Sequence, residues 1–141
     1  MMLKKLLIAV LGVVLLSGCA TRLNSLQERE YAAFENANVL VEEKNPTTGM
    51  ILGLLPGGGS FYVREPALGV INLLLWPASI LWDPISGLNG SKSINYDLTK
   101  YSLKKEKSKE IALLDQKLSS GELDTKSYAL EKSKINQKFD F

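Results

Sequence analysis

Hydrophobic side chains recur at helical spacing in the segment at residues 26–41. Tyr31, Phe34, Ala37 and Val41 fall on one face of a helix, and Leu23 and Leu26 lie just upstream. The remaining positions are mostly polar, with an excess of acidic residues. This pattern predicts a single amphipathic helix that packs its apolar face on the rest of the protein or on a partner. Asn45 and Pro46, with the polar residues that follow, predict a loop.

A second helical pattern occupies the last part of the chain. Over residues 98–118 the apolar stripe consists of Leu103, Ile111, Leu114 and Leu118, and Lys107 interrupts it. Two serines and Gly121 should end this helix, with the glycine at its C-terminal cap. A second helix is expected from Asp124, whose carboxylate can accept the free N–H groups of the first turn, while Leu123 and Tyr128 are spaced as a hydrophobic staple. Together these segments predict a helical hairpin.

Between these amphipathic regions the chain is almost free of charge. The 47 residues between Lys44 and Lys92 contain only three charged side chains, Arg64, Glu65 and Asp83, whereas about a dozen would be usual. Two apolar legs, residues 50–55 and 67–82, flank a break at residues 56–60 that contains three consecutive glycines, Gly57, Gly58 and Gly59. We expect an apolar hairpin with these glycines at its tight turn.

The hairpin is too short to span a bilayer comfortably. Its longer leg of 16 residues would reach about 24 Å as a helix, against a hydrocarbon core of about 30 Å, and Pro77 would break it near its end. Three placements remain open: a hairpin that dips into one leaflet, a core covered by the flanking helices, and a genuine transmembrane hairpin. Four aromatic residues are candidates for the membrane interface: Phe61, Tyr62, Trp76 and Trp82.

The amino-terminal residues carry a targeting signal. A basic start is followed by an apolar stretch at residues 6–16 and by small residues, which is the layout of a secretory signal. The string LSGC at residues 16–19 resembles the lipobox of bacterial lipoproteins. The resemblance implies cleavage after residue 18 and acylation of Cys19, the only cysteine, which would tether the protein to membrane lipid. In bacterial lipoproteins an Asp at the second position of the mature chain resembles an inner-membrane retention signal, and this chain has Ala20 there instead. The resemblance therefore implies the periplasmic leaflet of the outer membrane, with the inner membrane as the alternative.

Two further segments resemble known domains. The string GGGSFYVREPALGVINLLLW, at residues 57–76, resembles the turn and second helix of a small bacterial domain with two transmembrane helices. The string IALLDQKLSSGELDTKSYALEKSKI, at residues 111–135, resembles the SHOCT domain, a short pair of helices at the end of many bacterial proteins. That resemblance implies self-association or an envelope protein partner, for which the candidate contact residues are Leu114, Leu118, Leu123, Tyr128 and Ile135. Ser127 stands where the SHOCT family has an acidic residue, which removes one arm of the capping box.

Composition excludes most familiar chemistry. The chain has no His and one Cys, so the usual general base, the commonest metal ligand and an internal disulfide are absent, and we predict no cofactor and no bound metal. Lys4 and Lys5 account for the net charge of +2, so a product trimmed after residue 18 is neutral and nucleic acid is not an expected partner. Asp83 is the acidic residue to examine for function, although its place before Pro84 is more typical of a turn or a helix cap.

These observations predict a mainly α-helical protein with an amphipathic helix, a Gly/Pro-interrupted apolar hairpin and a C-terminal two-helix hairpin. The expected regions are a signal peptide at residues 1–18, a lipidated amino-terminal segment at 19–49, the apolar hairpin at 50–91 and the charged helical hairpin at 92–141. The sequence favours a noncatalytic lipid-anchored envelope lipoprotein. The alternative is a lipoprotein that perturbs membranes or excludes phage, and five lysines between residues 100 and 109 are read as a solvated helix face or a site for anionic head groups.

Overall fold

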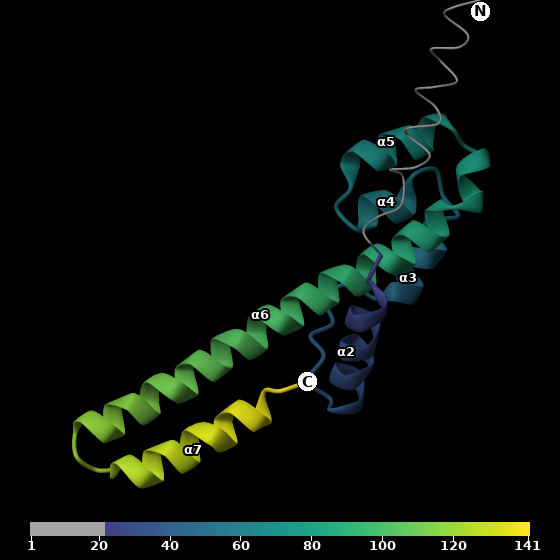
Figure 1. Ribbon diagram of the computed structural model, residues 1–141. Helices are drawn as coiled ribbons and strands as arrows, with labels where there is room; N and C mark the ends of the chain where they lie inside the picture. The colour runs from purple at the N-terminus through teal and green to yellow at the C-terminus, as the bar shows by residue number, and fades with distance from the viewer. Residues whose placement is uncertain (1–21) are drawn as a thin grey trace, which may run out of the picture. The chain divides into compact units, whose positions relative to one another are not determined.

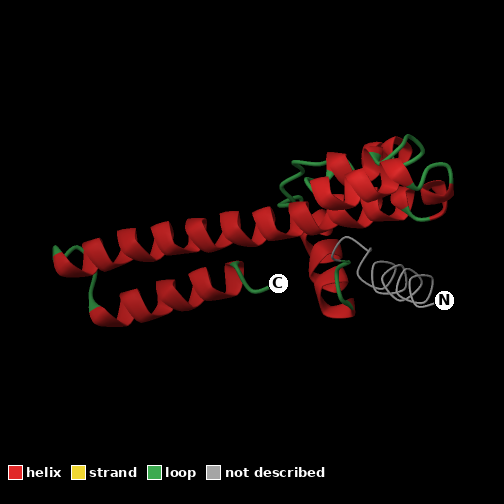
Figure 2. Ribbon diagram, turned by 90° about the horizontal axis from the view of Figure 1, so that it is seen from above, coloured by secondary structure: helices red, strands yellow, loops and turns green. Residues whose placement is uncertain are grey.

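A computed structural model describes residues 22–141, and every regular element in this part of the chain is helical (Figures 1 and 2). The mainly α-helical fold class is therefore confirmed. The described elements are α2 (Ser25–Asn36), α3 (Pro46–Leu52), α4 (Gly58–Tyr62), α5 (Pro66–Leu74), the 3-10 helix η1 (Ala78–Leu81), α6 (Asp83–Ser119) and α7 (Thr125–Lys138). Cys19 and the predicted signal segment lie outside the described residues.

The chain divides into two compact units. Within the described residues, the first unit comprises residues 22–27 and Glu42–Asn95, and the second comprises Glu28–Val41 and Tyr96–Phe141. The boundaries differ from the regions expected from composition, because both α2 and α6 contribute residues to each unit.

The first unit replaces the expected two-legged hairpin with a series of short helices. Prolines set their limits: Pro46 and Pro66 occupy the first helical positions of α3 and α5, where a missing N–H costs nothing. The side chain of Asn45 accepts a hydrogen bond from the N–H of Thr48 at 2.9 Å and so caps α3, where the sequence predicted only a loop. The α5 helix ends at Leu74, before Pro77, and η1 follows.

The amphipathic helix is shorter than its apolar pattern indicated. The α2 helix ends at Asn36, whereas the prediction extended it to Val41. Asn38 adopts a left-handed conformation with φ of 54°, and the N–H of Val39 bonds to the carbonyl of Phe34 at 3.0 Å. These are the features of a Schellman C-cap, in which asparagine is the usual substitute for glycine. Ala37 and Val41 therefore lie beyond the helix, and Tyr31 and Phe34 are its buried residues.

The longest helix begins well before its predicted start. The α6 helix runs from Asp83, not from residue 98, and so includes Gly87 and Gly90 in its interior. Glycine disfavours helices by about 1 kcal/mol, but both glycines are sites of close packing. A Cβ atom on Gly87 would lie 2.1 Å from the carbonyl oxygen of Gly49, and one on Gly90 would lie 2.8 Å from Val63. Packing of neighbouring segments on α6 therefore overrides helix propensity.

In the C-terminal hairpin, Gly121 and Asp124 occupy the cap positions predicted for them. The α6 helix ends at Ser119, Gly121 has a φ of 77°, and α7 runs alongside the second half of α6 (Figures 1 and 2). Asp124 accepts hydrogen bonds from the N–H groups of Lys126 and Ser127. The Ser127 hydroxyl donates to the second Asp124 oxygen at 2.7 Å. This bond adds a side-chain contact at the start of α7.

Aromatic residues form the core of the second unit. Phe34 is fully buried; its ring stacks on Tyr96 at a centroid distance of 5.9 Å and meets the edge of Phe141 at 5.3 Å. Leu114 is the buried aliphatic residue on α6.

No helix within residues 22–141 combines the length and the apolar character needed to cross a membrane.

Candidate functional site

The first unit has a polar centre built around the carboxylate of Asp83. Asp83 is fully buried and accepts hydrogen bonds from the backbone N–H groups of Gly59 and Ser60, both at 3.1 Å. The Ser60 hydroxyl donates to the same carboxylate at 2.6 Å, and the side-chain amide of Asn72 donates at 2.7 Å. Four donors thus compensate a charge that burial would otherwise make very costly.

The position of these residues explains why the carboxylate is needed. Gly57 precedes α4 in a left-handed conformation with φ of 70° and has no side chain to cap the helix. Asp83, the first residue of α6, supplies the cap from another part of the chain by accepting the second and third N–H groups of α4. The structure thus makes Asp83 a helix cap, but of α4 and not of the helix that it begins.

The polar centre extends through Asn72. Its amide nitrogen donates to the Ser60 hydroxyl at 2.9 Å, and its oxygen accepts the indole N–H of Trp82 at 2.8 Å. Ser79 is also fully buried, and its hydroxyl has no hydrogen-bond partner among the described residues. The network therefore ties α4, α5 and the start of α6 together.

A second group of polar contacts lies further along α6, around Asn95. The side chain of Asn95 accepts hydrogen bonds from the N–H groups of Glu43 and Lys44, both at 2.9 Å, and donates to the carbonyl of Lys44 at 2.7 Å. Arg64 forms an ion pair with Glu43, and the ammonium of Lys44 lies 4.6 Å from the centre of the Tyr62 ring. These contacts fix the segment that leads into α3.

Close contacts between backbones surround the polar centre. A Cβ on Gly59 would lie 2.5 Å from the carbonyl oxygen of Asp83, and one on Gly53 would lie 2.4 Å from the backbone of Pro84. A Cβ on Gly69 would meet the ring of Phe61 at 2.6 Å. A side chain at Gly53 or Gly59 would therefore clash with the backbone at the start of α6.

Many large apolar side chains of the first unit are exposed, and others, such as Leu68, Ile71 and Leu75, are half-buried. Val63 is its buried hydrophobic residue within residues 46–95, whereas serine, asparagine and aspartate fill the interior. Leu74 and Leu81 are 77% and 78% exposed, more than any other large hydrophobic side chain in the described chain. The others on this exterior are Met50, Ile51, Leu54, Leu55, Phe61, Val70, Leu73, Trp76 and Ile85. Val63 is thus the one buried large apolar side chain within residues 46–95.

The second unit contains a charged cluster at the start of its α6 segment. Glu30 accepts hydrogen bonds from the Tyr96 hydroxyl and from Lys100, whose nitrogen lies 3.0 Å away. These two hydrogen bonds lower the pKa of Glu30. Burial, followed by the bond to Glu30, raises the pKa of Tyr96 to about 12. The cluster therefore keeps the carboxylate ionised and the phenol neutral.

The four predicted membrane-interface residues separate into two pairs. Phe61 and Trp76 are exposed, as membrane contact requires. Tyr62 and Trp82 are half-buried, and their polar atoms are used internally: the Tyr62 hydroxyl accepts the N–H of Asn45 at 3.0 Å, and the Trp82 indole bonds to Asn72.

The structure also places the predicted glycine turn and the predicted C-terminal contact residues. Gly57 alone occupies the turn, because Gly58 and Gly59 are the first residues of α4. Leu114 is buried, and the other four predicted contact residues are half-buried: Leu118, Leu123, Tyr128 and Ile135. Tyr128 donates to Asp115 across the hairpin at 2.7 Å. Leu114 and Tyr128 therefore contribute to the helix pair itself, and the other three side chains are partly accessible.

Sequence reasoning missed Ser60 and Asn72 as partners of Asp83. The one available signal was the placement of polar residues inside an apolar run, which favours polar contacts in the interior. Within residues 22–141 no cluster of three or more His, Cys, Asp or Glu side chains could hold a metal ion. Comparison with known proteins adds no relative: no family model matches the chain, and neither the curated proteins nor the solved structures contain a significant match.

Proposed function

We propose that this protein is a noncatalytic bacterial envelope lipoprotein, tethered by acylated Cys19 to the periplasmic leaflet of the outer membrane. The apolar exterior of residues 46–85 rests in the same leaflet, and the C-terminal helix pair serves as an interaction module for a second copy or an envelope partner. The lipobox-like string at residues 16–19 supports the tether.

One observation carries the membrane-contact part of this proposal. Within residues 46–95 of the first unit, the fully buried side chains are mostly polar and eleven large apolar side chains are exposed, which is an unusual arrangement in water. An apolar exterior of this kind loses free energy in water and gains it in hydrocarbon, at about 25 cal/mol for each Å² transferred. A leaflet is the environment that fits it.

The backbone of the connecting turns is also suited to lipid, because exposed N–H groups are costly there. In the turn after α3, the N–H groups of Leu54, Leu55 and Gly58 bond to nearby carbonyls at 2.9 to 3.1 Å. In the turn after α5, those of Trp76, Ala78 and Ile80 do the same at 2.9 to 3.4 Å. Pro56 and Pro77 have no N–H to satisfy.

The short helices and the lipid tether support a shallow position. Each of α3, α4 and α5 has nine residues or fewer, whereas a spanning helix needs about 20. Acyl chains on Cys19 would contribute about 0.8 kcal/mol for each buried methylene group, and the apolar exterior would add to that anchorage.

The contact surface can be tested by floating the chain from residue 20 onward with phosphatidylcholine vesicles. This product lacks both the signal segment and the lipidated cysteine, so binding reports the protein surface alone. We expect it to float with the vesicles, and we expect the double substitution Leu74→Glu and Leu81→Glu to abolish flotation, because two carboxylates would enter the apolar layer.

The matched control changes two exposed leucines of the second unit, Leu113→Glu and Leu130→Glu, and should float as the parent does. Equal flotation of both double variants, or none of the parent, would contradict membrane contact.

The tether needs a separate measurement: intact mass and membrane fractionation of the native protein and of Cys19→Ser. Loss of acylation and of cleavage together is expected, and an unchanged full-length mass in both would refute the lipobox interpretation.

A further inference from the structure

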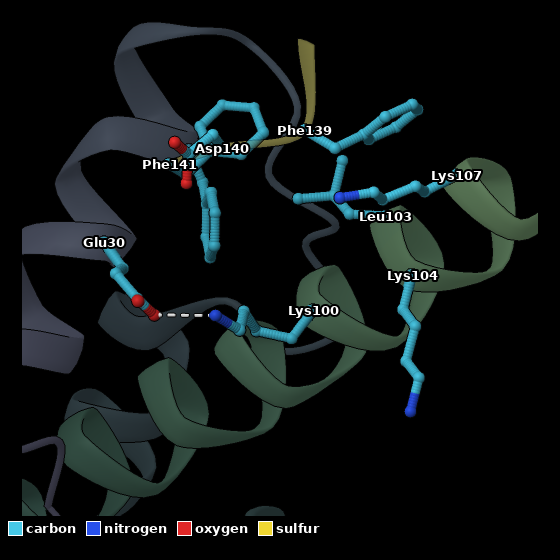
Figure 3. A pocket seen from close by; sticks show the side chains of 9 residues that line it. Glu30, Lys100, Leu103, Lys104, Lys107, Phe139, Asp140 and Phe141 are labelled. Carbon is cyan, nitrogen blue, oxygen red and sulfur yellow. Dashed lines mark hydrogen bonds and ion pairs between the residues drawn. The ribbon is translucent and has the colours of Figure 1, made fainter. Parts of the chain in front are cut away.

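A cavity of about 320 Å³ lies wholly within the second unit, between α2, α6 and the residues after α7 (Figure 3). This volume is at the lower end of the range for small-molecule sites. Its lining combines three phenylalanines with three lysines, so it offers apolar contact and positive charge together.

The apolar part of the lining is aromatic. Phe34 is fully buried behind the cavity, and Phe141 meets it edge-on at 5.3 Å. Phe139 and Leu103 lie on the opposite side (Figure 3). An aliphatic chain or an aromatic ring of a ligand would lose its contact with water between these walls.

The charges of the lining are unequally matched. Glu30 accepts hydrogen bonds from Lys100 and Tyr96, so Lys100 is already paired. The other charged side chains on the lining are Lys104, Lys107 and Asp140. No ion pair of Lys104 or Lys107 occurs within residues 22–141. The side chains of the lining therefore carry three positive charges and two negative ones, and Phe141, the last residue, adds its α-carboxylate.

Lys107 is the lysine of the lining that is best placed to bind an anion. It occupies the apolar stripe of α6, between Leu103 and Ile111, where it is half-buried. Its side chain extends along Leu103, whereas Lys104 points away from the phenylalanines (Figure 3). An ammonium group on an otherwise apolar stripe, beside an aromatic wall, is well suited to bind the head of an amphiphilic anion.

We propose that this cavity binds a small amphiphilic anion, with its carboxylate or phosphate head on Lys107 and its aliphatic or aromatic body against Phe139 and Phe141. The ligand is either free in solution or a lipid whose head group and first carbons enter from the membrane. This site goes beyond the proposed function and does not depend on insertion of the first unit.

The test uses the full chain, purified from membranes and reconstituted in phosphatidylcholine nanodiscs, with sodium octanoate as the probe. Calorimetric titration, corrected with empty discs, should give one saturable site. Lys107→Met keeps the apolar stem and removes the charge, so it should weaken octanoate binding about tenfold or more. Lys107→Arg should retain binding, and Lys105→Met, a change of the same charge on an exposed neighbour outside the lining, should bind as the parent does.

Two further arms complete the experiment. Uncharged 1-octanol should show no saturable site, because it lacks the anionic head. Discs that contain phosphatidylglycerol identify the source: weaker octanoate binding would mean that the lipid occupies the cavity, and unchanged binding would mean that the ligand is free in solution. Equal octanoate affinity of Lys107→Met and Lys105→Met, or no saturable binding by the parent protein, would overturn the proposal.

Discussion

The carboxylate of Asp83 is buried with neutral donors only, among the hydrogen bonds that the structure describes. Two of these donors are N–H groups at the amino end of α4, where the helix carries a partial positive charge. The other two, from Ser60 and Asn72, complete the shell of the carboxylate. A single residue thus joins the start of one helix to the start of another.

Replacing Asp83 by Asn should destabilise the first unit strongly. The amide would place an N–H₂ group against donors that now meet an oxygen, and we expect a loss of about 2–4 kcal/mol in the free energy of unfolding. Trp76 and Trp82 both belong to this unit, so their fluorescence during a denaturant titration measures it directly. Asp97→Asn, an exposed change on the same helix, is the control, and equal stability of the two variants would contradict a structural role for Asp83.

Tyr96 gives the second unit a dependence on alkaline pH. Because its pKa in the folded protein is raised from 10.0 to about 12, the stabilisation of the neutral phenol is complete below pH 10 and is lost between these values. Glu30 acts in the opposite sense: its pKa is lowered from 4.5, so its contribution is present above that value and is lost as the pH falls below it. We expect Tyr96→Phe to remove the most alkaline step from the tyrosinate absorbance titration, and an unchanged titration would contradict burial of this phenol.

At the scale of the helices, the sequence predicts features that depend on neighbouring residues, but it does not predict features that depend on contacts between distant segments. Gly121 and Asp124 were predicted as the caps of α6 and α7, because capping depends on a few neighbouring residues. The early start of α6 was missed, because Gly87 and Gly90 disfavour a helix unless another segment packs against them. The end of α2 at Asn36 had a local signal in Asn38, which the apolar spacing outweighed.

Gly87→Ala tests whether close packing determines the helix in that region. Helix propensity alone would stabilise the protein by about 1 kcal/mol, but the new Cβ would lie 2.1 Å from the backbone oxygen of Gly49, which cannot rotate away. We expect a net destabilisation of about 1–3 kcal/mol, as for other overpacked interiors. The exposed change Ser102→Ala on the same helix should be neutral or slightly stabilising, and a similar gain for Gly87→Ala would show that the contact with Gly49 is not close.

At the scale of the whole molecule, the sequence indicated which region is apolar but not which side of it faces outward. The low charge between Lys44 and Lys92 predicted contact with membrane or with the flanking helices equally well. The polar interior depends on Ser60, Asn72 and Asp83, which come from three separate elements and meet only in the folded chain. Polar residues dispersed in an apolar run have no period that a sequence pattern can detect.

The two tryptophans offer a measurement of depth. Trp76 is exposed on the apolar exterior, whereas the indole of Trp82 bonds to Asn72. In vesicles with brominated acyl chains, the variant that retains only Trp76, Trp82→Phe, should be quenched more strongly than Trp76→Phe, which retains only Trp82. Equal quenching of the two variants, or none, would contradict a leaflet position for the exterior around Trp76.

The polar interior of the first unit has a thermodynamic consequence. Unfolding raises the heat capacity by about 0.45 cal/K/mol for each Å² of newly hydrated apolar surface and lowers it by about 0.26 for polar surface. A unit that already exposes Leu74 and Leu81 and buries Ser60, Asn72 and Asp83 gains less apolar hydration when it unfolds in water than a unit with an apolar core. Calorimetry should therefore find a heat-capacity increment well below the usual value for its size, and the free energy of unfolding of this unit should change almost linearly with temperature, with little tendency toward cold denaturation.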